Sequence, residues 1–316
     1  MKSSFTLNNF KYWILIVGFS LFNRTIIAQD DSTKDLSQFV EIDGYKYHVR
    51  IGGEEHLMKG IPVVVLEAGF GNWNWDTIFN DIAKIAPVMA YERPGIGQSE
   101  WNQMEYSTLN VVQLLRKILM KIELPPPYVL VGHSWGGVLI RTYQGHFPDE
   151  VKALAYVDPT DFTINSNDNS ILLEMGVDTT GLKELDEKMY EAEMKGVQNL
   201  PAGYRDEMMY IFNFLVELNY EDRSLGSMPQ IPIVVFAGTN HPERITSAES
   251  ENPIEKAINS VEYYKASERQ RIESYTKWIF ESPKGYLIVS PKAGHYFHLD
   301  EPQLVIEMIK RLLEAE

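Results

Sequence analysis

The chain has 316 residues, the length of one large domain with an insertion or of two domains, and a formal net charge of −15. Hydrophobic residues make up 44% of it, so a substantial core can be buried and an intrinsically disordered composition is excluded. The acidic balance argues against a nucleic-acid partner, and the absence of cysteine excludes disulfides, thiolate nucleophiles and cysteine-based metal sites.

Residues 1–28 have the parts of a secretory signal peptide. Lys2 and Lys11 come before the apolar run 12–22, and the small residue Ala28 precedes a polar stretch. The run is shorter than the roughly 20 apolar residues that a spanning helix needs. We therefore predict cleavage after Ala28 and export to the periplasm or the medium. An uncleaved membrane anchor is the alternative.

Apolar runs and helical stretches alternate from residue 39 onward. Asp43-Gly44, flanked by alternating residues, predicts a β-hairpin with a two-residue turn. The predicted strands that follow are 61–66, 88–91, 128–131, 151–157, 231–236 and 286–289, and the predicted helices are 75–86, 109–122, 138–147 and 303–313. This alternation predicts an α/β fold with a mostly parallel central sheet and helices on both faces.

Residues 159–228 interrupt the alternation. The stretch has no strand signal and is acidic and helix-prone. We expect a helical insertion that covers the carboxyl edge of the sheet as a lid, where open α/β sheets bind ligands, although a packing appendage is the alternative. The insertion divides the predicted core into residues 29–158 and 229–316.

Gly132-His133-Ser134-Trp135-Gly136 stands between a predicted strand and a predicted helix. A sharp turn at this point strains the central residue and lifts the Ser134 hydroxyl above the sheet at a helix N-terminus, where negative charge is favoured. The glycines leave room for that turn. We therefore interpret Ser134 as a nucleophile and His133, whose side chain would point away from it, as a packing residue.

A serine at neutral pH needs a base and a carboxylate that orients the base. His295 follows the predicted strand 286–289, so it can reach the same sheet edge as Ser134, and His298 is the competing base. For the acid we prefer Asp158, at the end of the strand 151–157, with Glu243 in reserve. A turn or helix cap before Pro159 is the other interpretation of Asp158.

An oxyanion hole needs backbone N–H donors near the nucleophile. We expect one donor at Trp135, directly after Ser134, and the second at Phe70, where Gly69 and Gly71 allow the backbone to come close. The side chains of Phe70, Trp73 and Trp135 are candidate substrate-binding walls, with an ordinary core role as the alternative.

With these residues placed, the chain resembles the α/β-hydrolase fold superfamily. The resemblance covers about residues 39–316 apart from the insertion, and it is carried by LEAGFG (66–71), YERPGIGQS (91–99), PPYVLVGHSWGG (126–137), AYVDPTD (155–161) and AGHYFHLDEP (293–302). In the second segment, the resemblance implies that Arg93 shapes the site entrance rather than reacts.

The chain also departs from the pattern of this superfamily. Many relatives have His-Gly where this chain has Ala68-Gly69, and many carry the acid after the strand that corresponds to 231–236, where Asn240 and His241 stand here. Some carry it one strand earlier, which supports Asp158. Relatives that open epoxides or remove halides have Asp in place of Ser134, so the resemblance argues against both activities.

On these residues we expect an exported, carboxylesterase-like serine hydrolase with a small-molecule ester as substrate. Acyl transfer and the cleavage of amides or lactones use the same residues and are alternatives, as is a non-catalytic protein that binds a ligand. The sequence has no phosphate-binding loop, dinucleotide fingerprint or metal-ligand cluster, so we expect no cofactor and no metal. Nothing in it indicates an oligomeric state.

Overall fold

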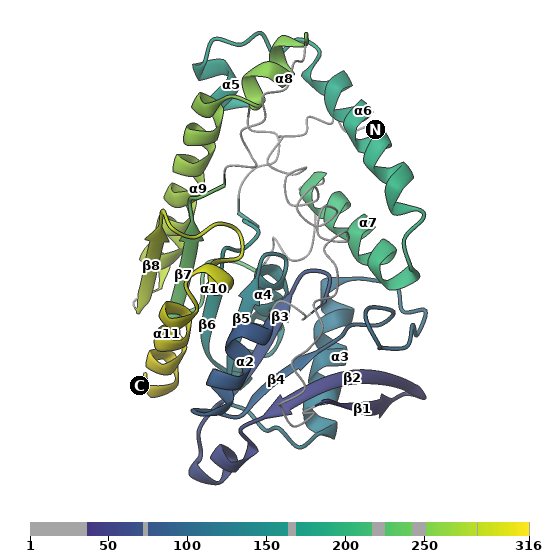
Figure 1. The fold of residues 1–316 in the computed structure, drawn as a ribbon, viewed down its shortest axis with the longest axis vertical. Coiled ribbons are helices and arrows are strands. Elements are labelled where there is room, and N and C mark those ends of the chain that lie inside the picture. Colours follow the sequence, from purple (N-terminus) through teal and green to yellow (C-terminus); the bar gives the residue numbers. More distant parts are fainter. Residues whose placement is uncertain are drawn as a thin grey trace.

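An eight-stranded sheet forms the centre of the molecule in the computed structural model (Figure 1). The structure describes residues 37–71, 75–163, 169–216, 225–241, 251–282 and 284–315. The strand order is β1-β2-β4-β3-β5-β6-β7-β8, in which β1 and β2 are antiparallel, β2 is antiparallel to β4, and all other neighbours are parallel. The predicted α/β architecture is confirmed.

The strands follow from two sequence patterns. Alternating residues form the β1–β2 hairpin, whose turn residues Asp43 and Gly44 have φ values of 52° and 86°. Solid apolar runs form the inner strands β3 to β7, in which all but one residue are buried because helices cover both faces. The bounds are β1 (Ser37–Ile42), β2 (Tyr45–Gly52), β3 (Val63–Ala68), β4 (Val88–Tyr91), β5 (Tyr128–His133), β6 (Val151–Val157), β7 (Ile233–Gly238) and β8 (Gly285–Ser290).

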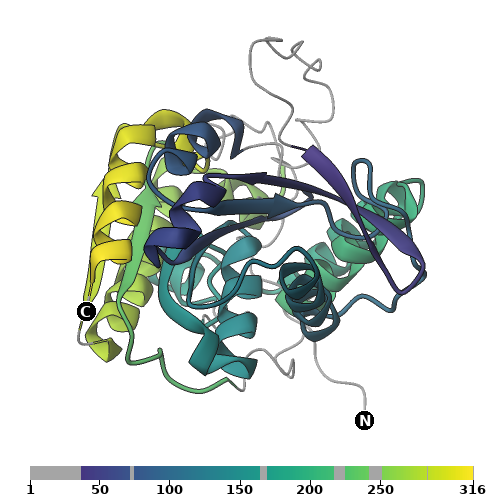
Figure 2. The same cartoon turned by 90° about the horizontal axis from the view of Figure 1, so that it is seen from below.

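Helices pack on both faces of the sheet (Figure 2). One face is covered by α2 (Asp76–Ala83) and α11 (Pro302–Glu314), and the other by α3 (Thr108–Lys121), α4 (Gly136–His146) and α9 (Val261–Glu281). Alternate residues of β3 enter the two cores: Val64 packs with α2, and Val65 packs on the opposite side with α3 and α4. The remaining short helical segments of the described core are η1 (Glu54–Lys59), η3 (Pro148–Glu150) and α10 (Phe297–Asp300).

Four more helices lie beyond one end of the sheet in Figure 1. Between β6 and β7 the described residues form α5 (Ser170–Glu174), α6 (Leu182–Val197) and α7 (Ala202–Val216), and α8 (Pro253–Ile258) follows β7. Apolar residues of α5, α6, α8 and α9 form a small core of their own. The described part of the stretch after β6 thus consists of helices and connecting loops, while its role as a lid stays a prediction. The sequence pattern predicts neither α8 nor α9.

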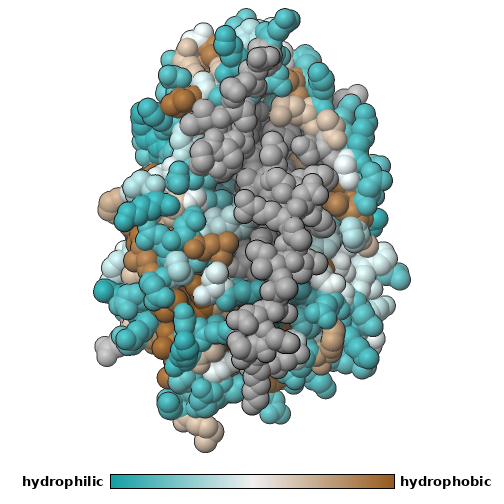
Figure 3. Space-filling model, viewed as in Figure 1, coloured by the Kyte–Doolittle hydropathy of each residue, from teal (hydrophilic) through white to brown (hydrophobic). Residues whose placement is uncertain are grey.

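The outer surface agrees with the acidic composition. Hydrophilic residues make up most of the coloured surface in Figure 3, with hydrophobic residues in small patches among them. Within the described part of the chain, no helix combines the length and the apolar character needed to cross a membrane. The predicted signal peptide lies outside the described residues.

Candidate active site

A sharp turn between β5 and α4 holds Ser134. Its φ is 53°, in the left-handed region that residues with a side chain rarely adopt, and the residue is buried. The neighbouring glycines have a steric reason. A Cβ on Gly132 would collide with the backbone of Gly136, and a Cβ on Gly136 would collide with the carbonyl of Glu67. The backbone therefore makes the sharp turn predicted for residues 132–136, which we call the elbow.

Ser134 and Asp158 follow the ends of neighbouring strands. His133 pairs with Val157 across β5 and β6, so Ser134 and Asp158 are the next residue along each strand. The N–H of Ser134 donates to the carbonyl of Val157 at 3.1 Å. Asp158 also has a left-handed φ, of 42°. Both residues are therefore held in sparsely populated conformations about one strand spacing (~4.8 Å) apart.

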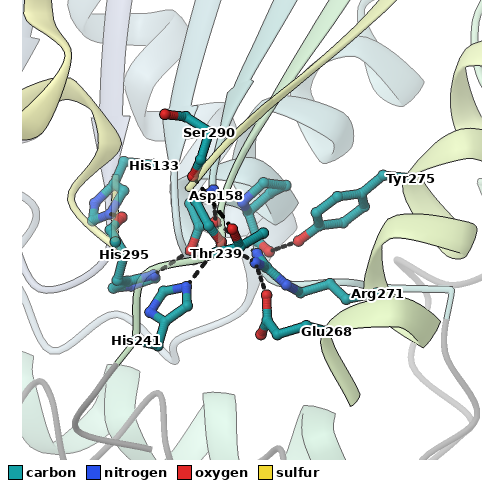
Figure 4. Close-up of polar contacts among 12 residues, drawn as sticks. His133, Asp158, Thr239, His241, Glu268, Arg271, Tyr275, Ser290 and His295 are labelled. Carbon is teal, nitrogen blue, oxygen red and sulfur yellow. Dashed lines mark hydrogen bonds and ion pairs between the residues drawn. The ribbon is translucent and has the colours of Figure 1, made fainter. Parts of the chain in front are cut away.

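Asp158 is hydrogen-bonded to His295. Nδ1 of His295 lies 2.8 Å from Oδ2 of Asp158, although 137 residues separate them in the chain (Figure 4). A carboxylate oxygen can only accept, so Nδ1 carries the proton and Nε2 keeps the lone pair that a general base uses. The structure thus brings the predicted base to the predicted acid, at the same edge of the sheet as Ser134.

His133 supports the loop that carries His295. Nε2 of His133 donates to the carbonyl of His295 at 2.8 Å, and the two ring centroids are 4.7 Å apart. Burial, followed by the neighbouring His295 and His298, lowers the pKa of His133 well below its usual range, so its ring is neutral. The interpretation of His133 as a packing residue missed this hydrogen bond.

The structure describes His298, the alternative to His295 as base, but not Glu243, the alternative to Asp158 as acid. His298, the competing base, is buried between the rings of Trp75 and His133, with centroid separations of 4.5 and 4.7 Å. Glu243, the reserve acid, lies outside the described residues. His241, which follows β7, donates from Nε2 to the carbonyl of Gly238 at 3.0 Å.

A buried arginine contacts the other oxygen of Asp158. Nη1 of Arg271, on α9, donates to Oδ1 at 2.6 Å, and the N–H of Gly238 donates to the same oxygen at 3.0 Å. Burial alone would raise the pKa of Asp158, but the charge of Arg271 and the hydrogen bond from His295 outweigh it and hold that pKa well below its usual range. Asp158 is therefore a carboxylate at neutral pH. Sequence reasoning missed Arg271 together with its helix.

The two expected oxyanion donors, the N–H groups of Trp135 and Phe70, differ in their surroundings. Gly69 lies against the elbow, since a Cβ there would be 3.2 Å from Cβ and 3.8 Å from the backbone N of Trp135. The N–H of Phe70, however, donates to Oε1 of Glu207 on α7 at 2.9 Å. The expectation that this amide is open to a substrate is therefore wrong for the conformation seen here. The cause is a carboxylate from the insertion, which residue spacing does not reveal.

Comparisons with known proteins agree with the fold. A family model described as the α/β hydrolase fold matches residues 61–189. The solved structure of the epoxide hydrolase CorEH without ligand superimposes with a TM-score of 0.58 at 16% identity, covering 88% of this chain and 98% of that one. The chain has the α/β-hydrolase fold. The carboxylesterase CesB from Bacillus subtilis has a TM-score of 0.55 at 15% identity over 96% of both chains. At these identities the likeness shows the fold alone.

Curated relatives of this α/β-hydrolase-fold protein match it over a shorter stretch. The uncharacterised protein YqjL of Bacillus subtilis (strain 168) is 27% identical over 120 residues, which are 37% of this chain and 46% of that protein. The chain thus covers less than half the length of that relative, and 36% of the uncharacterised protein YbdG from the same strain. These partial likenesses assign no activity to this chain.

Glu207 belongs to a second buried network beside the elbow. Arg93 binds it through Nε at 2.9 Å and through Nη2 at 2.8 Å, while Nη1 of Arg93 contacts Glu67 at 2.9 Å. Nη2 also donates to the carbonyl of Ala68 at 2.7 Å. Burial, opposed by Arg93 and supported by Glu207, raises the pKa of Glu67 to about 7. Arg93 therefore ties α7 to the loop after β3, beyond the entrance role that the resemblance implied.

Aromatic residues pack against the elbow. The side chain of Trp135 is fully buried, donates from Nε1 to the hydroxyl of Tyr106 at 3.1 Å, and packs edge-on against Tyr210 and Phe214 of α7. This burial fits the core alternative, and the role of Trp135 as a pocket wall stays a prediction. Trp73 lies outside the described residues. Within the described part of the chain, no group of three or more His, Cys, Asp or Glu side chains is arranged to hold a metal ion.

Proposed function

We propose that this α/β-hydrolase-fold protein is a serine hydrolase that cleaves a carboxylic ester through an acyl-enzyme intermediate. The observation that carries the proposal is the hydrogen bond between Asp158 and His295 at the sheet edge where the strained elbow holds Ser134. The order Ser134, Asp158, His295 along the chain is the order that the triad has in hydrolases of this fold.

The chemistry follows from the proton positions. Ser134 Oγ attacks the ester carbonyl while Nε2 of His295 takes its proton, and His295 then returns that proton to the leaving alcohol. Water, deprotonated in turn by His295, attacks the acyl carbonyl; the bond to Ser134 Oγ then breaks, His295 returns the proton to Oγ, and the acid is released. Asp158 stays ionised throughout, holding Nδ1–H and stabilising the imidazolium that forms twice in each cycle.

For Phe70 to stabilise the oxyanion, Glu207 of α7 has to release its N–H. A carboxylate on the N–H of Phe70 would repel the negative charge that develops on the substrate oxygen. In the proposed mechanism the N–H of Trp135 is the first donor, and Glu207 leaves Phe70 when the acyl group binds, so that Phe70 becomes the second. The insertion would then act as a lid whose position controls the completeness of the site.

The test is ester turnover by matched serine variants. Ser134→Ala should lower kcat/KM for a p-nitrophenyl ester by at least about 1,000-fold, because no other group replaces the nucleophile. Ser227→Ala, which changes an exposed serine, serves as the control and should retain full activity. Wild-type turnover by Ser134→Ala would refute the proposal. A panel of amides, lactones and competing alcohols then separates ester hydrolysis from the other acyl transfers that the same residues support.

A further inference from the structure

The Asp158 carboxylate is shared between two partners on opposite sides. Oδ2 accepts from His295, while Oδ1 accepts from Arg271 and from the N–H of Gly238 (Figure 4). The exposed fractions of the Asp158 and Arg271 side chains are 2% and 1%. Water therefore screens their contact only weakly, and the charge of the guanidinium acts strongly on the carboxylate.

Arg271 is itself fixed on the side away from His295. Its Nη2 donates to Glu268, one turn earlier on α9, at 2.5 Å and also to the carbonyl of Gly238. Both strand-end residues are thus tied to α9: Gly238 through its carbonyl, and Asp158 through its carboxylate. With Oδ1 doubly occupied, the carboxyl group cannot rotate without breaking two buried hydrogen bonds, so Oδ2 stays directed at His295.

We propose, on the basis of the proposed function, that Arg271 is a positioning residue for the triad. Its guanidinium fixes the rotamer of Asp158, and its charge sets the acid limit of the pH range in which His295 acts as base. A buried positive charge beyond Asp158 opposes the positive charge of a protonated His295. The imidazole consequently stays neutral, and able to accept a proton, at lower pH than it would with Asp158 alone.

Other ionisable groups face this pair and contribute to the same balance. They are Glu268 and Tyr275 on α9, His241 after β7, His133 on β5, Tyr296 beside His295, and His298 on α10. Glu268 is the most informative of them because it contacts Arg271 rather than Asp158, so its negative charge partly offsets the charge of Arg271. Removing Arg271 and removing Glu268 should therefore have opposite effects.

The experiment measures the rate at which a fluorophosphonate reacts with the intact protein between pH 4 and pH 9. In that reaction Ser134 Oγ forms a bond to phosphorus, fluoride leaves, and His295 takes the hydroxyl proton. Arg271→Met should move the acid limb of the rate profile up by about one pH unit, because a like charge is removed from the imidazolium. Glu268→Gln should move it down by about half a unit.

Arg271→Lys is the matched conservative variant. It keeps the charge but loses the planar fork, so the acid limb should stay within about 0.3 pH units of wild type while the maximal rate falls severalfold. An effect on folding alone would change the amount of active protein and leave the limb in place. Acid limbs that coincide in Arg271→Met, Glu268→Gln and the wild type would overturn the inference.

A second readout covers variants that label poorly. The His295 imidazole is titrated by NMR, with its signals identified by their loss in His295→Gln. The titration should stay within about 0.3 pH units of wild type in Arg271→Lys, move down in Glu268→Gln and, where it folds, move up in Arg271→Met. An unshifted titration in Glu268→Gln and Arg271→Met contradicts the role of Arg271. If instead the titrations shift as expected but wild type does not react at Ser134, the proposed hydrolase function fails while the electrostatic role of Arg271 stands.

Discussion

Two buried arginines stand at the carboxyl edge of the sheet, and each binds two carboxylates and a backbone carbonyl. The first set consists of Arg93 with Glu67, Glu207 and the carbonyl of Ala68, and the second of Arg271 with Asp158, Glu268 and the carbonyl of Gly238. The two sets contain the same kinds of group, but the pKa of one carboxyl group is shifted up and that of the other is shifted down. The pKa of Glu67 is raised to about 7, whereas that of Asp158 is held well below its usual range.

The difference lies in the charges and donors around each carboxylate. Arg93 makes two contacts with Glu207 and one with Glu67, and the negative charge of Glu207 adds to burial in raising the pKa of Glu67. Asp158 receives Arg271, a backbone N–H and His295, which together outweigh its burial. An arginine beside a buried carboxylate therefore does not by itself decide the protonation state; the other charges and the hydrogen-bond donors around that carboxylate decide it together.

The largest expected effect is on activity. Asp158→Asn should lower the kcat for ester hydrolysis by about 10,000-fold, because an amide at this position no longer selects the tautomer with Nε2 free or stabilises the imidazolium. Glu67→Gln, the isosteric change in the other network, should lower it by less than about tenfold, since Glu67 contacts none of the three residues. Equal losses in the two variants would mean that the networks do not differ in function.

The next effect is on stability. Arg93→Met leaves two carboxylates buried without their cation and should lower the free energy of unfolding by about 3–5 kcal/mol, as measured by urea denaturation. Arg311→Met, which removes an exposed arginine paired with Glu307 on the same helix, should change it by less than about 0.5 kcal/mol. A loss for Arg93→Met that is no larger than that of the control would show that the ion pairs do not hold α7 in place.

The smallest effect is a pH dependence. Because the pKa of Glu67 lies at about 7 in the folded protein, above its ordinary value of 4.5, the folded state holds this proton more tightly than the unfolded chain does. The resulting stability is present below about pH 4.5 and is lost as the pH rises through 7. Asp158 behaves in the opposite way, since its stabilisation is lost as the pH falls below its ordinary range.

Glu67→Gln isolates the first of these trends. The side-chain amide of this variant cannot lose a proton, so its unfolding free energy should fall by about 2 kcal/mol less than that of wild type between pH 5 and pH 8. Glu105→Gln, at an exposed position, should follow the wild-type curve. Parallel curves for Glu67→Gln and wild type would show that Glu67 titrates as an ordinary carboxyl group.

The sequence predicted most of the fold and the three residues of the candidate triad, because strand ends carry positional information. Ser134, Asp158 and His295 each follow a run of apolar residues, and parallel strands bring such positions to one edge. Arg271 was missed because it lies within α9, whose polar sequence contains no motif. Glu207 was missed because a helical sequence in an insertion does not show which residue points at the core.

The most direct test of the proposed mechanism is the site of fluorophosphonate attachment. Folded wild-type protein is treated with the probe, digested, and mapped by peptide mass spectrometry, with His295→Gln as the parallel sample. We expect a single adduct on Ser134 in the wild type and none on the same time scale in His295→Gln, because the hydroxyl needs the imidazole that Asp158 holds. An adduct on a different serine, or an unmodified Ser134 in the folded protein, would contradict it.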